Sequence, residues 1–368
     1  MINNKLLRNL DCTLIGVTVL LNIISIIMIG SATHVNSIAE DRYWYMQRQG
    51  IFFLVNVLIV FFTLKFDYRN LLQASKVIYI FNLLMLVAVL VVGHSALGAQ
   101  RWIQIGPVSL QPSEFSKIIM IVTFAAFLEE RKGKLKKLVD IAPVLLFVII
   151  PAIIVMKQPD LGTSLVFFAI MLGMVYVAGI NTRFLLSSMG ICVLLLPVFW
   201  QVLKEYQKSR IKVFLNPEMD PLGSGYHVIQ SKIAIGSGLI TGKGLFQGTQ
   251  SQLSFLPENH TDFIFAVIGE ELGLIGCLFV LLLYAILIYR GLKIAMNAQD
   301  DFGALIAVGI VSMFIFHLFV NIGMTIGIMP VTGVPLPFMS YGVSALTTNM
   351  LSVGLLLNIN MRKQKLMF

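Results

Sequence analysis

The chain has 368 residues, of which 57% are hydrophobic and only 12% charged, and its formal net charge is +9. Soluble domains carry roughly 25% charged residues, so this composition excludes a soluble globular protein and indicates an all-α polytopic membrane protein. The basic excess does not indicate nucleic-acid binding, because the Lys and Arg residues are scattered between apolar runs, as is typical of cytoplasmic loops.

The apolar runs predict about ten transmembrane helices, because each is long enough to cross about 30 Å of hydrocarbon. In chain order they fall near residues 12–30, 49–66, 74–93, 113–128, 139–156, 161–180, 184–203, 263–289, 303–328 and 340–360. The first run shows no small-residue cleavage site, so we interpret it as a retained span. We expect residues 1–368 to form a single transmembrane domain.

The distribution of Lys and Arg predicts how these spans are oriented. Outside the polar stretch 204–262, most basic residues fall in cytoplasmic segments if the N-terminus lies inside. We therefore expect both termini in the cytoplasm and 204–262 as a large extracytoplasmic loop between helices 7 and 8. Asp262 ends this loop where water meets lipid, and an acid there is a site hypothesis by default.

Two polar clusters come first among those on the expected outer side. Arg101 precedes Trp102, a pair that suits either an interfacial anchor or a substrate contact. Glu114 and Lys117 lie three residues apart at the start of a span and face the same side. They form either an ion pair that eases a helix end into lipid or the lining of a polar cavity, and the cost of burying both favours the cavity.

Two further acids stand just before predicted helices. Asp160 could merely cap the helix that follows it, and Thr261 or Asp262 could cap the next. Glu270 and Glu271 lie deeper in the helix after Asp262, Glu271 on the opposite face. We interpret Glu271 as a residue that hydrogen-bonds a neighbouring helix, while the role of Glu270 stays open.

The last two spans carry polar residues and an irregular connection. His317 and Asn321 lie four apart on one face, where packing between helices is the simpler explanation. Residues 329–342 contain three prolines and two glycines, which exclude a regular helix. Such backbone is tolerated at membrane depth only against protein or water, so we predict a re-entrant element that lines the same outer cavity.

Acids and cations on one outward-facing cavity suit an anionic, lipid-linked substrate whose head group reacts outside. Arg and Lys would hold phosphate. A carboxylate would act either as a general base or as a ligand of a divalent cation, and composition leaves both roles open. Residues 238–244 fail as a phosphate-binding P-loop in spacing and in the missing Ser or Thr, so ATP bound here would not drive the reaction.

Several ungapped sequence segments are distributed along nearly the whole chain, at residues 100–102, 111–117, 157–163, 216–225, 225–238, 248–265 and 335–342. Together these segments resemble the SEDS family. The Gly-Thr-Gln-Ser-Gln segment at 248–252 favours the elongation branch of the family over the division branch. Val343 departs from the pattern, because the family usually has a second glycine there, and we expect only a small change in packing.

The resemblance implies a peptidoglycan glycosyltransferase that polymerises lipid II into glycan strands during elongation and rod-shape maintenance. It would act at the outer face of the bacterial cytoplasmic membrane. Asp262 would be the catalytic base for the acceptor GlcNAc 4-hydroxyl, which attacks C1 of the donor MurNAc with inversion and expels undecaprenyl diphosphate. Asp160 and Glu114 match cavity acids that could hold a divalent cation (Mg or Mn), and no organic cofactor is expected. The residues expected to bind substrate are Arg101, Lys117, Glu114, Asp160, Arg210 and Lys232.

The resemblance also implies partners. We expect lipid II and the nascent glycan strand, a class B penicillin-binding protein as transpeptidase, other membrane proteins of the elongation complex, and membrane lipids. A lipid II flippase and a non-enzymatic scaffold are the alternatives. A flippase would need a polar lining on the inner side, for which only Glu270, Glu271, His317 and Asn321 are candidates, so the outer bias of the acids favours the enzyme.

Overall fold

The protein is a multi-pass bundle of long apolar helices. The computed structural model describes residues 9–35, 41–96, 99–106, 108–133, 140–180, 190, 200, 201, 203, 205–220, 223–253 and 255–363. Within them, six helices are long and apolar enough to cross a membrane: α2 (Cys12–Thr33), α3 (Trp44–Lys65), α4 (Asn70–Val92), α13 (Ile264–Met296), α14 (Asp301–Thr325) and α15 (Val343–Met361).

Three more apolar helices coincide with expected spans. They are α5 (Pro112–Glu129), α6 (Ile141–Lys157) and α7 (Leu161–Val177), which are shorter or carry more charge. The expected span near 184–203 lies largely outside the described residues. The other predicted spans are helical, and most of their ends agree with the prediction within five residues, because apolar stretches are local features of the sequence. The exception is α13, which ends at Met296 and not near residue 289.

Local signals fix several helix starts. Asp11, Asp160 and Asp300 each accept a hydrogen bond from a backbone N–H in the first turn of α2, α7 and α14. Pro112 stands at the first turn of α5, where its missing N–H costs nothing. Helix α14 lies inside the bundle and packs against α13, α7 and α5, while α15 packs against α3.

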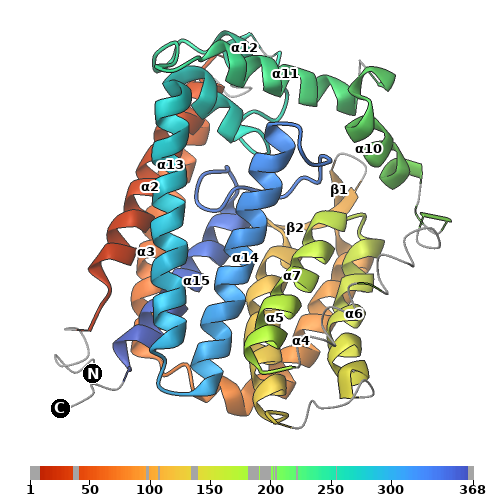
Figure 1. Ribbon diagram of the computed structural model, residues 1–368, viewed down its shortest axis with the longest axis vertical. Helices are drawn as coiled ribbons and strands as arrows, with labels where there is room; N and C mark the ends of the chain where they lie inside the picture. The colour runs from red at the N-terminus through yellow and green to blue at the C-terminus, as the bar shows by residue number, and fades with distance from the viewer. Residues whose placement is uncertain are drawn as a thin grey trace.

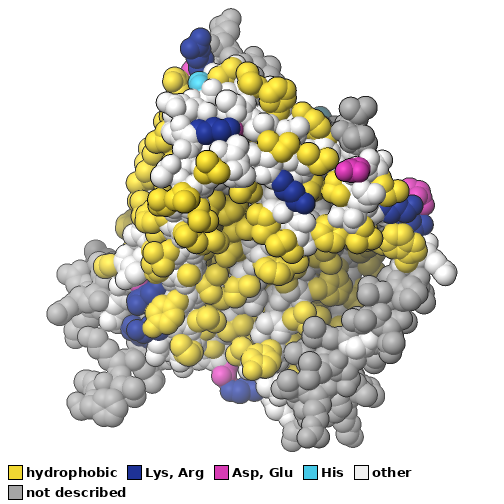
Figure 2. All heavy atoms as spheres, turned by 45° about the horizontal axis from the view of Figure 1, so that its top comes forward, with side chains coloured by type: hydrophobic (Ala, Val, Ile, Leu, Met, Phe, Trp, Pro, Cys, Tyr) yellow, Lys and Arg dark blue, Asp and Glu magenta, His cyan; other side chains and the backbone are white. Residues whose placement is uncertain are grey.

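Short elements cover one end of the bundle, which we call the loop end (Figure 1). The expected loop 204–262 contains α10 (Glu205–Leu215), the 3₁₀ turn η2 (Pro217–Met219), α11 (Ser224–Ser237) and α12 (Thr249–Gln252). Ser231 Oγ of α11 donates to the carbonyl of Thr325 at 2.7 Å, which places α11 over the end of α14. Figure 2, turned toward this end, shows apolar side chains over much of the surface and charged ones singly or in small groups.

A small antiparallel sheet also lies among these connections, where the sequence predicted only loops. Its strands are β1 (His94–Ala96), β2 (Ala99–Ile105) and β3 (Val108–Leu110), with β2 in the centre. Arg101 and Trp102 lie on β2, where Trp102 pairs with His94 and Arg101 lies at an irregularity in the pairing.

The start of α2 and the end of α15 meet at the opposite end of the bundle. Asn9 Nδ2 donates to the carbonyl of Met361 at 3.4 Å, and Asn360 Nδ2 donates to the carbonyl of Asn9 at 2.7 Å. The beginning and end of the described chain therefore lie on one side, away from α11 and α12 (Figure 1).

The helix α13 is broken at Gly273, which the sequence analysis did not foresee. Gly273 has φ 64° and ψ −162°, and a Cβ atom there would lie 2.3 Å from the backbone nitrogen of Gly242. The N–H groups of Leu274 and Ile275 donate to the carbonyls of Leu239 and Ile240 at 2.9 and 3.2 Å. Glu270 and Glu271 both precede the break, and their side chains meet the 238–250 segment.

Candidate active site

Asp262 lies in the turn of residues 258–263, directly before α13. The N–H groups of Thr261, Asp262 and Phe263 all donate to the carbonyl of Glu258, at 3.2, 3.1 and 3.2 Å. Phe263 is the N-cap of α13 and no side chain caps that helix. The alternative reading of Thr261 or Asp262 as a helix cap is therefore wrong. Within the described residues the Asp262 carboxylate has no hydrogen-bond partner, and its side chain is half-buried.

The irregular segment 329–342 holds this turn from the side. Ser340 Oγ donates to the carbonyl of Thr261 at 2.6 Å, and the N–H of Tyr341 donates to the carbonyl of His260 at 2.9 Å. The two segments are thus joined at consecutive residues. The predicted irregular backbone is confirmed, and it lies against the turn that carries Asp262.

Asn321 of α14 ties the same two segments together. Its Nδ2 donates to the carbonyl of Asp262 at 3.0 Å and to the carbonyl of Val334 at 2.9 Å. Next to Val334, Gly333 has φ +73°, and a Cβ atom there would lie 3.4 Å from Oδ2 of Asp262. The backbone of residues 333–334 therefore forms one wall beside the carboxylate.

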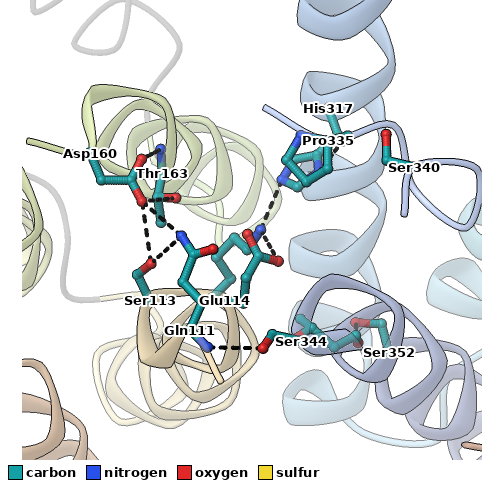
Figure 3. Close-up of polar contacts among 12 residues, drawn as sticks. Gln111, Ser113, Glu114, Asp160, Thr163, His317, Pro335, Ser340, Ser344 and Ser352 are labelled. Carbon is teal, nitrogen blue, oxygen red and sulfur yellow. Dashed lines mark hydrogen bonds and ion pairs between the residues drawn. The ribbon is translucent and has the colours of Figure 1, made fainter. Parts of the chain in front are cut away.

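Asp160 lies at the start of α7 and is fully occupied by protein donors (Figure 3). Its Oδ1 accepts from the N–H of Thr163 at 3.1 Å. Its Oδ2 accepts from Thr163 Oγ1, Gln111 Nε2 and Ser113 Oγ at 2.9, 3.2 and 3.3 Å. The expected capping role is confirmed, and Asp160 also joins α7 to the start of α5.

Glu114 and Lys117 form the expected ion pair and are both buried. Lys117 Nζ lies 2.7 Å from Glu114 Oε2 and 3.4 Å from His317 Nε2. His317 Nδ1 lies 3.2 Å from the carbonyl of Pro335, which can only accept, so Nε2 is left to accept from Lys117. This chain of contacts links α5, α14 and the segment 329–342.

Arg101 reaches from β2 to the turn before Asp160. Its Nε donates to the carbonyl of Gln158 at 3.0 Å, and its Nη2 donates to the carbonyl of Pro159. A Cβ atom on Gly162 would lie 2.8 Å from Cγ2 of Val334, so the start of α7 packs directly on the segment beside Asp262. Arg101 and Asp160 are thereby brought to the same region as Asp262.

The electrostatics of Asp262 reflect these neighbours. Burial raises the pKa of Asp262 to about 6, and the negative charges of Glu258 and Asp160 add to the rise. The positive charges of Arg210 and Arg101 oppose it. The structure therefore gathers Asp262, Asp160, Arg101 and Arg210 at one site, with Glu258 as an acid that the sequence analysis did not assign to it.

Lys232 lies apart from this group. Its side chain is exposed and extends over Gly327, where a Cβ atom would lie 2.6 Å from Nζ. The structure describes no ion pair or hydrogen bond that connects Lys232 to Asp262. Its role as a substrate-binding residue stays a prediction.

The role of His317 and Asn321 was predicted only in part. Both were interpreted as polar contacts between helices, and His317 does contact Lys117 of α5, but both also contact the segment 329–342 at the site. Their spacing of four residues on one buried helix face was visible in the sequence. Their partners lie in other elements, so the pattern alone could not show what they hold.

The acids do not form a metal site by themselves. Among the described residues no group of three or more His, Cys, Asp or Glu side chains could hold a metal ion. Asp160 accepts four donor contacts and Glu114 pairs with Lys117, so in this arrangement both carboxylates are already engaged by protein groups. The expected cation stays a prediction, and no step proposed below depends on it.

Glu270 and Glu271 hold the segment 243–250 at the loop end. Glu270 Oε1 accepts from Lys243 Nζ at 2.7 Å and from the N–H of Gln250 at 2.9 Å. Glu271 Oε1 accepts from Ser31 Oγ of α2 at 2.5 Å, so its predicted bond to a neighbouring helix is confirmed. Both acids therefore stabilise the loop end.

Comparison with known proteins places this chain among cell-wall proteins. The sequence model of the FTSW_RODA_SPOVE family, described as "Cell cycle protein", matches residues 11–365. "Peptidoglycan glycosyltransferase MrdB" of Escherichia coli (strain K12) is 47% identical over 292 residues, which are 78% of each chain. "Stage V sporulation protein E" of Bacillus subtilis (strain 168) is 40% identical over 360 residues, 95% of this chain and 96% of that one.

Two solved structures share the fold. A chain from "Structural coordination of polymerization and crosslinking by a peptidoglycan synthase complex" is 30% identical, has a TM-score of 0.82 and covers 95% of this chain and 97% of its own. The Thermus thermophilus rod shape determining protein RodA is 26% identical with a TM-score of 0.72, and covers 97% of this chain and 98% of its own.

Proposed function

Because the chain belongs to the FtsW/RodA/SpoVE family, we propose that it is a peptidoglycan glycosyltransferase that polymerises lipid II during cell elongation. One observation carries the chemical part of this proposal. A half-buried carboxylate, Asp262, has no capping role, has a pKa raised to about 6, and lies near the guanidinium groups of Arg101 and Arg210.

Asp262 acts as the general base. A base works best when its pKa lies near the working pH, and burial brings Asp262 to that range. Its carboxylate takes the proton of the acceptor GlcNAc 4-hydroxyl as that oxygen attacks C1 of the donor MurNAc. The bond from C1 to the diphosphate oxygen breaks, and the configuration at C1 inverts.

The cations stabilise the leaving group. The diphosphate already carries two negative charges, and one more develops on its oxygen as the bond to C1 breaks. Arg101 and Arg210 lie near the base and can stabilise that charge. Arg101 is already held by the carbonyls of Gln158 and Pro159, so little freedom is lost when substrate binds. Lys117 is buried and acts through its contacts with Glu114 and His317, and direct contact with diphosphate stays a prediction.

The flippase alternative receives less support. The four candidates for an inner polar lining were Glu270, Glu271, His317 and Asn321. Each contacts a segment of the loop end or of residues 329–342. This arrangement leaves none of the four to line a path toward the opposite end of the bundle.

The proposed location is the bacterial cytoplasmic membrane, with both termini inside and the site facing outward. The basic residues of the connections favour this orientation. A class B penicillin-binding protein is the proposed partner, which would crosslink the strands made here. One of the structures similar to this chain comes from a peptidoglycan synthase complex, which supports a partner of this kind.

The test is polymerisation of purified lipid II by the detergent-solubilised protein with its penicillin-binding partner, transpeptidation being blocked. Wild type is compared with Asp262→Asn, and Glu218→Gln serves as a matched control because Glu218 is an exposed acid of the same loop. We expect long strands from wild type and the control, and none from Asp262→Asn. Equal polymerisation by Asp262→Asn would remove the base assignment, and an inactive wild type would favour transport.

A further inference from the structure

Three aromatic side chains from distant parts of the chain meet beside the turn that carries Asp262. The ring of Tyr45, in the first turn of α3, lies 4.9 Å from that of His260 and 5.0 Å from that of Tyr341. The rings of His260 and Tyr341 are 5.7 Å apart. These distances are those of rings in direct contact, at tilted or edge-to-face angles.

This aromatic cluster is fixed rigidly to the turn of residues 258–263, which carries Asp262. His260 stands two residues before Asp262, and its carbonyl accepts from the N–H of Tyr341 at 2.9 Å. Ser340, which precedes Tyr341, donates its Oγ hydrogen bond to the carbonyl of Thr261. A molecule that rests on the aromatic cluster is therefore held at a defined distance from the Asp262 carboxylate.

The cluster is not sealed into the core. All three side chains keep partial exposure, and Trp44, whose ring contacts Tyr45 at 4.8 Å, is 37% exposed. In the described structure neither the Tyr45 nor the Tyr341 hydroxyl has a hydrogen-bond partner, although tyrosine hydroxyls away from water normally find one. Flat apolar rings with accessible polar tips are suited to a ligand with both kinds of surface.

His260 contributes a neutral polar group. Burial lowers the pKa of His260, so the imidazole is uncharged at neutral pH. Its Nδ1 lies 3.3 Å from Asn259 Oδ1, which can only accept, so Nδ1 carries the proton and Nε2 is an acceptor. The aromatic cluster thus offers hydroxyl donors and a nitrogen acceptor, and the guanidinium of Arg48, 4.8 Å from the Trp44 ring, is the charged group beside it.

The two arginines that act on Asp262 lie on other elements. Arg101 belongs to β2 and Arg210 to α10, whereas the cluster rests on α3. In Figure 1, α3 stands with α2 and α13 on one half of the molecule, and α10 stands on the other. The diphosphate is therefore expected on the side of Asp262 where Arg101 and Arg210 lie, and the saccharide on the side of the aromatic rings.

We propose that Tyr45, His260 and Tyr341 form a binding platform for the saccharide of the acceptor strand. Pyranose rings present an apolar C–H face that packs on aromatic rings, while their hydroxyl and N-acetyl groups pair with the polar tips. The platform would place the 4-hydroxyl of the terminal GlcNAc at Asp262. This inference rests on the proposed function, since it assigns the acceptor sugar to the same site.

Saccharide binding is the first test, and it needs no turnover. The probe is a soluble GlcNAc–MurNAc tetrasaccharide without lipid or diphosphate, added to detergent-solubilised Asp262→Asn. Trp44 lies in contact with Tyr45, so tryptophan fluorescence is a suitable readout. We expect Tyr45→Leu and Tyr341→Leu to weaken binding by roughly tenfold or more. Tyr45→Phe, which keeps the ring, should lose less.

The control is Tyr289→Leu, because Tyr289 is 58% exposed on α13 and far from the turn in sequence. Thermal unfolding of each variant checks that the fold is kept. Saccharide binding by a folded Tyr45→Leu protein equal to that of its parent would overturn the proposal. So would equal losses in Tyr289→Leu.

Polymerisation separates this inference from the proposed function. In the otherwise wild-type enzyme, Tyr45→Leu should raise the KM for lipid II and shorten the strands, with a smaller effect on kcat. If Asp262→Asn abolishes polymerisation while the tyrosine variants behave as wild type, the platform is wrong and the glycosyltransferase stands. If wild type binds the tetrasaccharide but never polymerises, the proposed function fails and the saccharide site remains.

Discussion

Gly333 lies directly against the carboxylate of Asp262. A Cβ atom on Gly333 would lie 3.4 Å from Asp262 Oδ2, and φ of Gly333 is +73°. Asn321 holds the two segments at this separation, because its amide donates to the carbonyls of both Asp262 and Val334. The glycine therefore leaves the space in which an acceptor hydroxyl can reach the base.

Gly333→Ala is expected to lower polymerisation several-fold. The methyl group would shield Asp262 from water and substrate, and the positive φ would add strain of roughly 1–2 kcal/mol. Gly106→Ala is the matched control, because Gly106 has φ +60° with nothing within 4 Å of the added Cβ. Initial rates and thermal unfolding of both variants measure the effect. A Gly333→Ala enzyme no slower than Gly106→Ala would contradict the prediction.

The rate of polymerisation should depend on pH through Asp262. The base must be deprotonated, and its pKa is raised to about 6, so the rate should rise as pH passes about 6 and level off above it. Glu258→Gln removes a negative charge and should shift this rise to lower pH. Arg210→Gln removes a positive charge and should shift it to higher pH. Initial rates at saturating lipid II give the midpoints, and midpoints that do not move would remove Asp262 as the titrating base.

Lys117→Met should destabilise the protein strongly. Lys117 is 1% exposed and its partner Glu114 4%, so the variant leaves a buried carboxylate unpaired, at a cost of about 3–5 kcal/mol. The double variant Glu114→Gln/Lys117→Met should recover much of that loss. Unfolding in detergent measures the stability of the single and the double variant, and polymerisation should be impaired in both. A double variant as unstable as Lys117→Met would contradict the pairing.

Gly273→Ala should damage the loop end. Its Cβ would lie 2.3 Å from the nitrogen of Gly242 at φ 64°, so the break in α13 could not form as it stands. Gly16→Ala on α2 has open space and a helical backbone, and should be neutral or stabilise by about 0.5–1 kcal/mol. Thermal unfolding of the pair, with limited proteolysis of the 238–250 segment, checks the difference. Equal stability of the two variants would show that the break is not required.

The sequence by itself determined the features that depend on neighbouring residues. Apolar runs predicted the helices, Asp160 predicted its cap through Thr163, and Glu114 and Lys117 predicted their pair at a spacing of three. The sequence segments that resemble a known family also indicated Asp262 as the base. Each of these signals lies within one helix, one turn or one ungapped segment, so no knowledge of packing was needed.

Only the tertiary structure decided which of these residues meet. Lys117 and His317 are 200 positions apart, and Gly333 reaches Asp262 from a separate segment. The break at Gly273 depends on backbone bonds to Leu239 and Ile240, which belong to a separate segment. Such contacts arise where elements distant in sequence compete for the same buried hydrogen-bonding groups, and a pattern read along one chain does not contain the outcome of that competition.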